Sequence, residues 1–149
     1  MHAFLPFLFL FLYHSQEVRA GTFCSEVQYT LINDTRRSTA FKSSPPYLCD
    51  RGIIEDNKWY RFYSASGNIT LIPTENPGLN RCGTHVPIWF NGEHPTEENI
   101  IVNATACAAI AFQLPKGCGI SYDIKVVKCP GDFYLYKLKE PKQCFLAYC

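Results

Sequence analysis

Trp59-Tyr60-Arg61-Phe62-Tyr63 is the densest aromatic run in the chain outside its N-terminal region. Trp59, Arg61 and Tyr63 alternate with Tyr60 and Phe62, and alternate side chains of a strand point to opposite faces. Large side chains on both faces are typical of a strand between two covering layers. We therefore expect a core strand here, with the shorter segments of the chain organised around it.

Two neighbouring segments are interpreted from their turn residues. The turn cluster 64–68 predicts a hairpin between 59–63 and the β-branched segment 69–72. Pro87 lies inside the apolar run 86–90. Because proline lacks the N–H that a central strand uses, this run is expected to be an edge strand or an extended loop segment.

The remaining apolar segments are also short and bounded by turns. Segment 99–114 begins with residues that favour a strand and continues with alanines that would suit a helix; the turn at 117–119 favours strand, turn, strand. Further strands are expected at 27–31, 122–126 and 133–138. The expected fold class is mainly β, a small disulfide-rich extracellular domain of short antiparallel strands and hairpins with little helix.

The N-terminal region has the features of a secretory signal. Its apolar run, residues 4–13, is shorter than the roughly 20 residues that a membrane-spanning helix needs. Val18-Arg19-Ala20 supplies an aliphatic and a small residue at the third-last and last positions before a cut. No Lys or Arg precedes the run, and a retained membrane anchor is the alternative. We predict a signal peptide over 1–20 and one secreted domain over 21–149, with no membrane span in the mature chain.

Eight cysteines follow the predicted cut, and none precedes it. An even number of cysteines behind a secretory signal predicts four disulfides. A zinc site is disfavoured because the chain has no C-x-x-C pair. The spacing alone leaves all 105 possible pairings open.

Three N-glycan acceptor sites agree with a secreted protein. They are Asn33-Asp34-Thr35, Asn68-Ile69-Thr70 and Asn103-Ala104-Thr105, and none has proline in the middle position. Each three-residue pattern occurs often by chance. Together with the signal and the cysteines, however, they predict a secreted glycoprotein with glycans on Asn33, Asn68 and Asn103.

Charge and motifs do not support nucleic-acid binding or catalysis. The chain has 14 Lys and Arg against 13 Asp and Glu, whereas phosphate binding needs a surplus of basic residues. It has no G-x-S-x-G elbow, glycine-rich phosphate loop or spaced Cys–His pair. His85 and His94 lie near Glu93, Glu97 and Glu98 but lack the spacing of a helical zinc motif. We expect no enzyme activity, no cofactor, no metal and no nucleic-acid partner.

Four stretches together resemble the eight-cysteine domain of the uromodulin and pancreatic secretory-granule glycoprotein family. They are Leu31-Ile32-Asn33-Asp34-Thr35-Arg36-Arg37-Ser38; Cys49-Asp50 with Trp59-Tyr60-Arg61-Phe62; Cys82-Gly83-Thr84 with Pro87-Ile88-Trp89-Phe90-Asn91-Gly92-Glu93-His94-Pro95; and Phe133-Tyr134-Leu135-Tyr136-Lys137-Leu138 with Cys144 to Cys149. The resemblance covers essentially the whole of 21–149.

The resemblance implies a mainly β domain without catalytic activity, held by four disulfides. Carried over to this sequence, the family pairing joins Cys24 to Cys129, Cys49 to Cys144, Cys82 to Cys149 and Cys107 to Cys118. It also makes Arg61 a structural partner for a nearby acid, with Asp34 and Asp50 as candidates.

Some relatives carry glycans on this domain that bacterial fimbrial lectins bind. Here Glu93 stands where Thr or Ser would have made Asn91 an acceptor. The epidermal-growth-factor-like and polymerisation modules of relatives are not seen in this sequence. The resemblance thus implies an extracellular interaction or decoy module whose partner is an extracellular protein or a glycan-binding one. The alternatives are a soluble effector (lectin, toxin or protease inhibitor), motivated by Trp89 if exposed, or a fragment of a longer mosaic glycoprotein.

Overall fold

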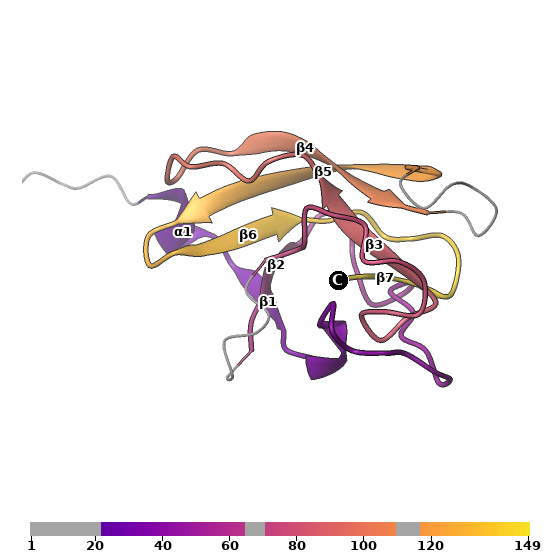
Figure 1. Ribbon diagram of the computed structural model, residues 1–149. Helices are drawn as coiled ribbons and strands as arrows, with labels where there is room; N and C mark the ends of the chain where they lie inside the picture. Colours follow the sequence, from indigo (N-terminus) through magenta and orange to yellow (C-terminus); the bar gives the residue numbers. More distant parts are fainter. Residues whose placement is uncertain (1–21, 65–70, 110–116) are drawn as a thin grey trace, which may run out of the picture.

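The computed structural model describes residues 22–64, 71–109 and 117–149, so the predicted signal peptide lies outside the described residues. Seven strands form one sheet in the order β1-β2-β6-β5-β4-β3-β7. The elements in chain order are α1 (Phe23–Glu26), β1 (Tyr29–Ile32), the 3-10 helix η1 (Thr35–Arg37), β2 (Trp59–Phe62), β3 (Val86–Asn91), β4 (Val102–Ala108), β5 (Ile120–Cys129), β6 (Phe133–Lys137) and β7 (Leu146–Tyr148). Figure 1 shows the sheet curled, with β3 and β7 folded back opposite β1 and β2.

The sheet is mixed, which confirms a mainly β fold with little helix but corrects its expected antiparallel character. β1 pairs with β2, and β3 pairs with β7, in parallel. The other four pairings are antiparallel. Parallel neighbours need a long crossover, and residues 33–58, which contain η1, provide one between β1 and β2.

The aromatic stretch forms β2, as expected, but only one of its faces lies in the main core. Tyr60 and Phe62 are buried on the inner face, whereas Tyr63, just beyond the strand, is 43% exposed. The outer face is covered in part by α1, where the Phe23 ring meets the Trp59 ring edge-on at a centroid distance of 5.0 Å. The expected second covering layer is therefore present but small, since Trp59 and Phe23 pack against Val127 and Leu135 in a separate cluster.

Most of the expected hairpin after β2 lies outside the described residues, and its described end, residues 71–72, is not a strand. β1 pairs with all four residues of β2, and β6 pairs with Trp59 and Tyr60. Residues 65–70 lie outside the described residues. Ile72 is fully buried and not in a strand, and its N–H donates to the Tyr136 hydroxyl at 3.2 Å.

β3 is not an edge strand, despite Pro87. It lies between β4 and β7. The N–H of Val86 donates to the Phe145 carbonyl, and because bonding residues alternate along a parallel pair, Pro87 faces away from β7. On the other side, pairing with β4 starts only at Ile88. Proline at position 87 therefore costs no backbone hydrogen bond to either neighbouring strand.

The strands expected in the second half of the chain are confirmed. Segment 99–114 contains β4, which pairs antiparallel with β5 over its whole length; residues 110–116 lie outside the described residues. Ala106 and Ala108 pack into the core rather than building a helix. Ile124 and Val126 of β5 are buried on the same face, and β6 follows as predicted.

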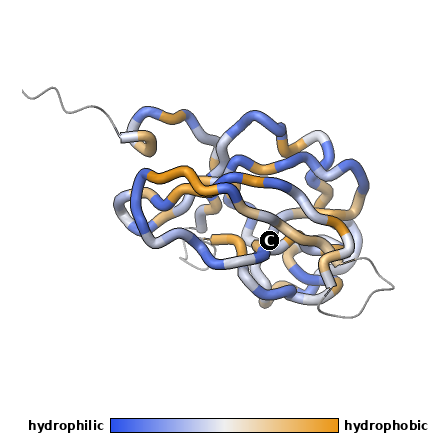
Figure 2. Tube along the Cα trace, turned by 90° about the horizontal axis from the view of Figure 1, so that it is seen from above, coloured by the Kyte–Doolittle hydropathy of each residue, from blue (hydrophilic) through white to orange (hydrophobic). Residues whose placement is uncertain are grey.

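The main core lies inside the curl of the sheet. It includes aromatic residues from β2, β3, β6 and β7, such as Phe62, Phe90, Tyr136 and Tyr148. Figure 2 shows apolar stretches (orange) distributed among polar ones (blue) along the chain. Within the described ranges no helix has the length and apolar character needed to cross a membrane.

Gly83 makes the tightest glycine contact in the described chain, and its replacement is expected to be destabilising. A Cβ at Gly83 would lie 2.6 Å from Leu48 Cδ1 and 2.9 Å from Arg36 Cβ. Gly52 has a similar φ (+77° against +75°) but open space around it. Left-handed backbone costs about 1–2 kcal/mol for a residue with a Cβ, so Gly52→Ala should lose about that much and Gly83→Ala clearly more. Urea unfolding of both variants measures the difference; equal losses would contradict the tight contact.

Candidate functional site

Four disulfides hold the sheet in its curled form. They are Cys24–Cys129, Cys49–Cys144, Cys82–Cys149 and Cys107–Cys118, the same pairs that the family resemblance implies. Three of them join residues 67 or more positions apart. The described residues contain no free cysteine, which leaves no thiol there for nucleophilic chemistry.

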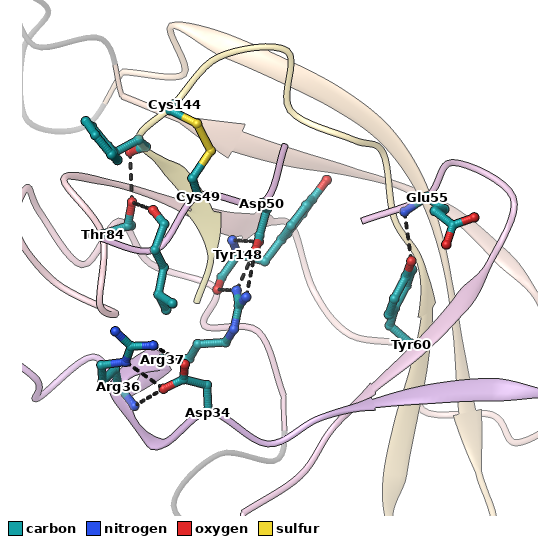
Figure 3. Close-up of polar contacts among 12 residues, drawn as sticks. Asp34, Arg36, Arg37, Cys49, Asp50, Glu55, Tyr60, Thr84, Cys144 and Tyr148 are labelled. Carbon is teal, nitrogen blue, oxygen red and sulfur yellow. Dashed lines mark hydrogen bonds and ion pairs between the residues drawn. A yellow bond between two sulfur atoms is a disulfide. The ribbon is translucent and has the colours of Figure 1, made fainter. Parts of the chain in front are cut away.

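A buried ion pair lies beside the Cys49–Cys144 disulfide (Figure 3). Arg37 donates from Nη1 to Asp50 Oδ2 at 2.9 Å and from Nη2 to Asp50 Oδ1 at 2.6 Å. The same guanidinium donates to the Tyr148 carbonyl at 2.7 Å, and the Tyr148 N–H donates to Asp50 at 2.8 Å. The side chains of Arg37 and Asp50 are 5% and 1% exposed. This network joins η1, the loop before β2 and strand β7.

A polar contact at Thr84 closes the same region. The Thr84 hydroxyl lies 2.9 Å from the Leu48 carbonyl and 2.8 Å from the Phe145 carbonyl (Figure 3). Leu48 and Phe145 are the neighbours of Cys49 and Cys144, which are joined by a disulfide. The region is therefore a structural brace, because most of its buried polar groups bond to one another; Arg37 Nε is buried without a hydrogen-bond partner.

The expected pairing of Arg61 with an acid is wrong. Asp50 is held by Arg37, and Asp34 pairs with Arg36 at 2.6 Å. Arg61 instead places its guanidinium over the Phe133 ring, 3.8 Å from the centroid, and reaches the Tyr29 hydroxyl at 3.5 Å. The negative face of the aromatic ring attracts the guanidinium, so the ring takes the place of the expected carboxylate. The Arg37–Asp50 pair was missed, although Arg37 stands in one of the quoted family stretches.

Asp34 begins η1 and fixes the turn after β1. Its carboxylate accepts hydrogen bonds from the N–H and the side chain of Arg36. The side-chain hydrogen bond from Arg36 lowers the pKa of Asp34 below its ordinary value. Asn33 precedes this turn and is exposed, so the carboxyl end of β1 presents the acceptor asparagine to solvent.

The three predicted glycan acceptors are not gathered in one place. Asn33 follows β1 at one end of the sheet, and Asn103 lies on β4, which is separated from β1 by three strands. Both are exposed. Asn103 and Thr105 border an open recess of about 510 Å³ together with Asp123, Lys125 and Lys139. Asn68 lies outside the described residues.

The two histidines considered for metal binding have other partners. His85 Nδ1 lies 2.9 Å from Asn80 Oδ1. His94 stacks on Phe90 at a centroid distance of 4.3 Å, and its Nε2 lies 2.8 Å from the Tyr136 hydroxyl. In the part of the chain that the structure describes, no three His, Cys, Asp or Glu side chains gather as metal ligands.

His94 is expected to make stability fall in mild acid. Burial lowers the pKa of His94 below its ordinary value of 6.5. As the pH falls, the unfolded chain therefore binds the proton before the folded chain does. The contribution of His94 to the free energy of unfolding is fully present above about pH 6.5 and declines below it. Urea unfolding near pH 7.5 and near pH 5 measures the loss. His94→Gln should reduce the difference between the two pH values, whereas His85→Gln should preserve it; an unchanged difference in His94→Gln would contradict the assignment.

Trp89 does not provide a ligand-binding surface. It lies on β3, opposite Cys107 of β4, and is only 4% exposed. The motive for a sugar-binding or toxin-like effector was an exposed Trp89. Its burial removes that motive.

Comparison with known proteins gives the family. The chain matches the family model of the uromodulin-like eight-cysteine domain over residues 60–149. It is 40% identical over 121 residues to uromodulin of Mus musculus, covering 81% of this chain and 17% of that protein. It is 34% identical over 121 residues to pancreatic secretory granule membrane major glycoprotein GP2 of Homo sapiens, covering 81% of this chain and 21% of that protein.

The match extends beyond the family region into the first half of the chain, because 81% coverage exceeds residues 60–149. This chain spans about a fifth of the length of these relatives. The mainly β sheet, the four disulfides and the sequence matches all point to the same family. The chain belongs to the family of uromodulin-like eight-cysteine domains.

Proposed function

We propose that this chain is a secreted, N-glycosylated, non-enzymatic interaction or decoy module of the extracellular space. The observation that carries the proposal is the exposure of Asn33, just after β1, and of Asn103 on β4, in a domain of this family held by four disulfides. Two glycans on one domain offer two linked epitopes to a multivalent partner, which raises avidity without new contacts.

Compartment and chemistry support this proposal. Four disulfides persist in oxidising compartments such as the secretory pathway and the extracellular space. The relative GP2 is named a glycoprotein of the secretory granule membrane. We propose cleavage after Ala20, a mature domain over 21–149, and no catalytic site or cofactor. Partners are then extracellular proteins that recognise glycans or the protein surface.

A binding experiment tests the decoy role. The protein purified from cells that express the full 149-residue sequence is passed over immobilised bacterial fimbrial lectins, before and after amidase removal of N-glycans. We expect retention before treatment and none after it. The single variants Asn33→Gln and Asn103→Gln should each weaken retention, and Asn91→Gln, which alters no acceptor site, serves as the matched control. No retention in either state would contradict the decoy role.

A module of a longer protein is a second candidate, favoured by the length comparison. The chain spans about a fifth of uromodulin and GP2, and extracellular mosaic proteins repeat small domains of this size. Sequencing of transcripts decides between the two. Reading frames that continue past Cys149 into further modules would favour the mosaic protein, and a stop codon after Cys149 would favour the single domain.

A further inference from the structure

The two edges of the sheet differ in how they are covered. At one edge, all three residues of β7 (Leu146–Tyr148) are buried. At the other edge, β1 (Tyr29–Ile32) exposes its first three residues. β1 has the sequence Tyr-Thr-Leu-Ile, without a charge or a proline. Charges, prolines and covering segments are the devices that protect edge strands from pairing with another chain, and β1 carries no charge or proline of its own.

The outward backbone groups of β1 are known from its pairing with β2. The N–H of Tyr63 donates to the Ile32 carbonyl. Because bonding residues alternate along a parallel strand pair, Thr30 and Ile32 face β2, and Tyr29 and Leu31 face the open edge. Within the described ranges, no other segment hydrogen-bonds to the backbone of Tyr29 or Leu31. Their donors and acceptors are available to an added strand.

A groove runs beside this edge. It is a recess of about 320 Å³, bordered on one side by residues 30–34 and on the other by Leu48 and the turn that contains Ile53 and Ile54. Leu31 is 51% exposed and Ile53 is 63% exposed. The groove therefore combines free backbone groups on one wall with apolar side chains on both walls, which is the combination that captures extended peptides by strand addition.

The size of the groove selects its occupant. Four strand residues are about 13 Å long, too short an edge to bury the roughly 1,200–2,000 Å² of a stable protein–protein interface. One short, extended peptide segment fits this space, whereas the β1 edge of a second copy does not.

Charge adds a preference for an acidic segment. Arg51 is exposed and stands in the same turn as Ile53. Among the described residues it forms no ion pair. The acids near the groove are each paired with a cation: Asp50 with Arg37 and Asp34 with Arg36, both acids lining the groove, and Glu140, which accepts from the Gly52 N–H, with Lys142. A cation at the rim of an interface attracts a partner of opposite charge and raises the association rate.

We propose that the groove between β1 and the Ile53 turn binds an extended segment of a partner protein, with alternating apolar residues and an acidic flank, as an eighth strand of the sheet. The contact belongs to the protein surface and is separate from the glycans. Asn33 borders the groove, so the experiment uses the Asn33→Gln variant, in which no glycan covers the site and no new carboxylate forms there. Failure of this proposal therefore leaves the glycan-based function untouched, and the reverse also holds.

Fluorescence anisotropy with synthetic peptides tests the proposal. The probe is a fluorescein-labelled Asp-Val-Thr-Val-Thr-Val-Asp peptide, and the comparison peptide has the same composition in block order. We expect saturable binding of the alternating peptide and none of the block peptide below about 1 mM. Two N-methylated probes examine the backbone: methyl groups on one alternate set of residues should abolish binding, and those on the other set should preserve it. Equal effects of the two methylation patterns, or equal binding of both sequences, would overturn strand addition.

Matched variants locate the site. Ile53→Asp should weaken binding of the alternating peptide at least tenfold, about 1.4 kcal/mol. Ile101→Asp is the control, since Ile101 is 42% exposed and precedes β4, away from β1; it should leave binding unchanged. Leu31→Lys is a second test at an exposed side chain of the opposite wall. Equal effects of Ile53→Asp and Ile101→Asp, or a concentration-dependent dimer in sedimentation that Ile53→Asp abolishes, would overturn the peptide-binding assignment.

Discussion

Replacement of Asp50 by alanine is expected to lower the free energy of unfolding by about 3 to 5 kcal/mol. Asp50 is fully buried and accepts hydrogen bonds from the Arg37 guanidinium and from the Tyr148 N–H. Its removal leaves the Arg37 charge buried without a carboxylate. The loss is large because desolvation of an unpaired ion in the interior is expensive, whatever the net value of the intact pair.

Two comparisons make this prediction specific. Glu55→Ala removes an ion pair to Lys58 whose side chains are both more than half exposed, and it should leave stability unchanged within error because solvent screens such pairs. The double variant Arg37→Met with Asp50→Leu removes both charges and should recover part of the loss from Asp50→Ala. Urea unfolding with the disulfides intact measures all three. A similar effect of Asp50→Ala and Glu55→Ala would contradict the expected cost of leaving the Arg37 charge buried without a carboxylate.

The stability lost when a disulfide is removed is expected to increase with the sequence separation of its two cysteines. Cys24–Cys129 joins residues 105 positions apart, and Cys107–Cys118 joins residues 11 apart. A cross-link restricts the unfolded chain more when it closes a longer loop. The variant Cys24→Ala with Cys129→Ala should therefore lose about 5 kcal/mol, and Cys107→Ala with Cys118→Ala about 3 kcal/mol.

The comparison of the two variants is the informative measurement. Each protein is first checked by non-reducing peptide mapping to show that the other three disulfides are intact. Urea unfolding then gives the two free energies. Equal losses, or a larger loss from the Cys107–Cys118 variant, would mean that strain or native contacts, rather than restriction of the unfolded chain, set the contribution of these disulfides.

Local patterns in the sequence predict the strands but not their neighbours. Alternation of large side chains is a property of one segment, so β2 and β5 were predicted correctly. The parallel pairing of β1 with β2 brings together strands joined by residues 33–58. A short turn after β2 favours the nearer partner, a hairpin with 69–72, whereas the observed neighbours of β2 are strands far away in the sequence.

The position of Pro87 shows the same limit. The rule that proline marks an edge applies only where the missing N–H would face a neighbour, and here that position lies before the start of the β3–β4 pairing. Register is a relation between two strands, and the proline alone carries no information about it. The rule therefore gave the wrong location for β3.

The candidate site was predictable where it depends on short motifs. The acceptor patterns at Asn33 and Asn103 are readable from three residues each, although their exposure becomes known only from the fold. The partner of Asp50 was not predictable, because Arg37 and Arg61 are both plausible in sequence and only the curl of the sheet decides between them. The groove beside β1 depends on the position of the Ile53 turn, which is likewise a tertiary property.

Mass spectrometry of the protein secreted by cells that express the full sequence tests the proposed function most directly. We expect a protein in the medium that begins at Gly21 and carries N-glycans on Asn33 and Asn103, each site losing its glycan in the corresponding Asn→Gln variant. Retention of the chain inside the cell, or a secreted chain with both asparagines unmodified, would contradict it.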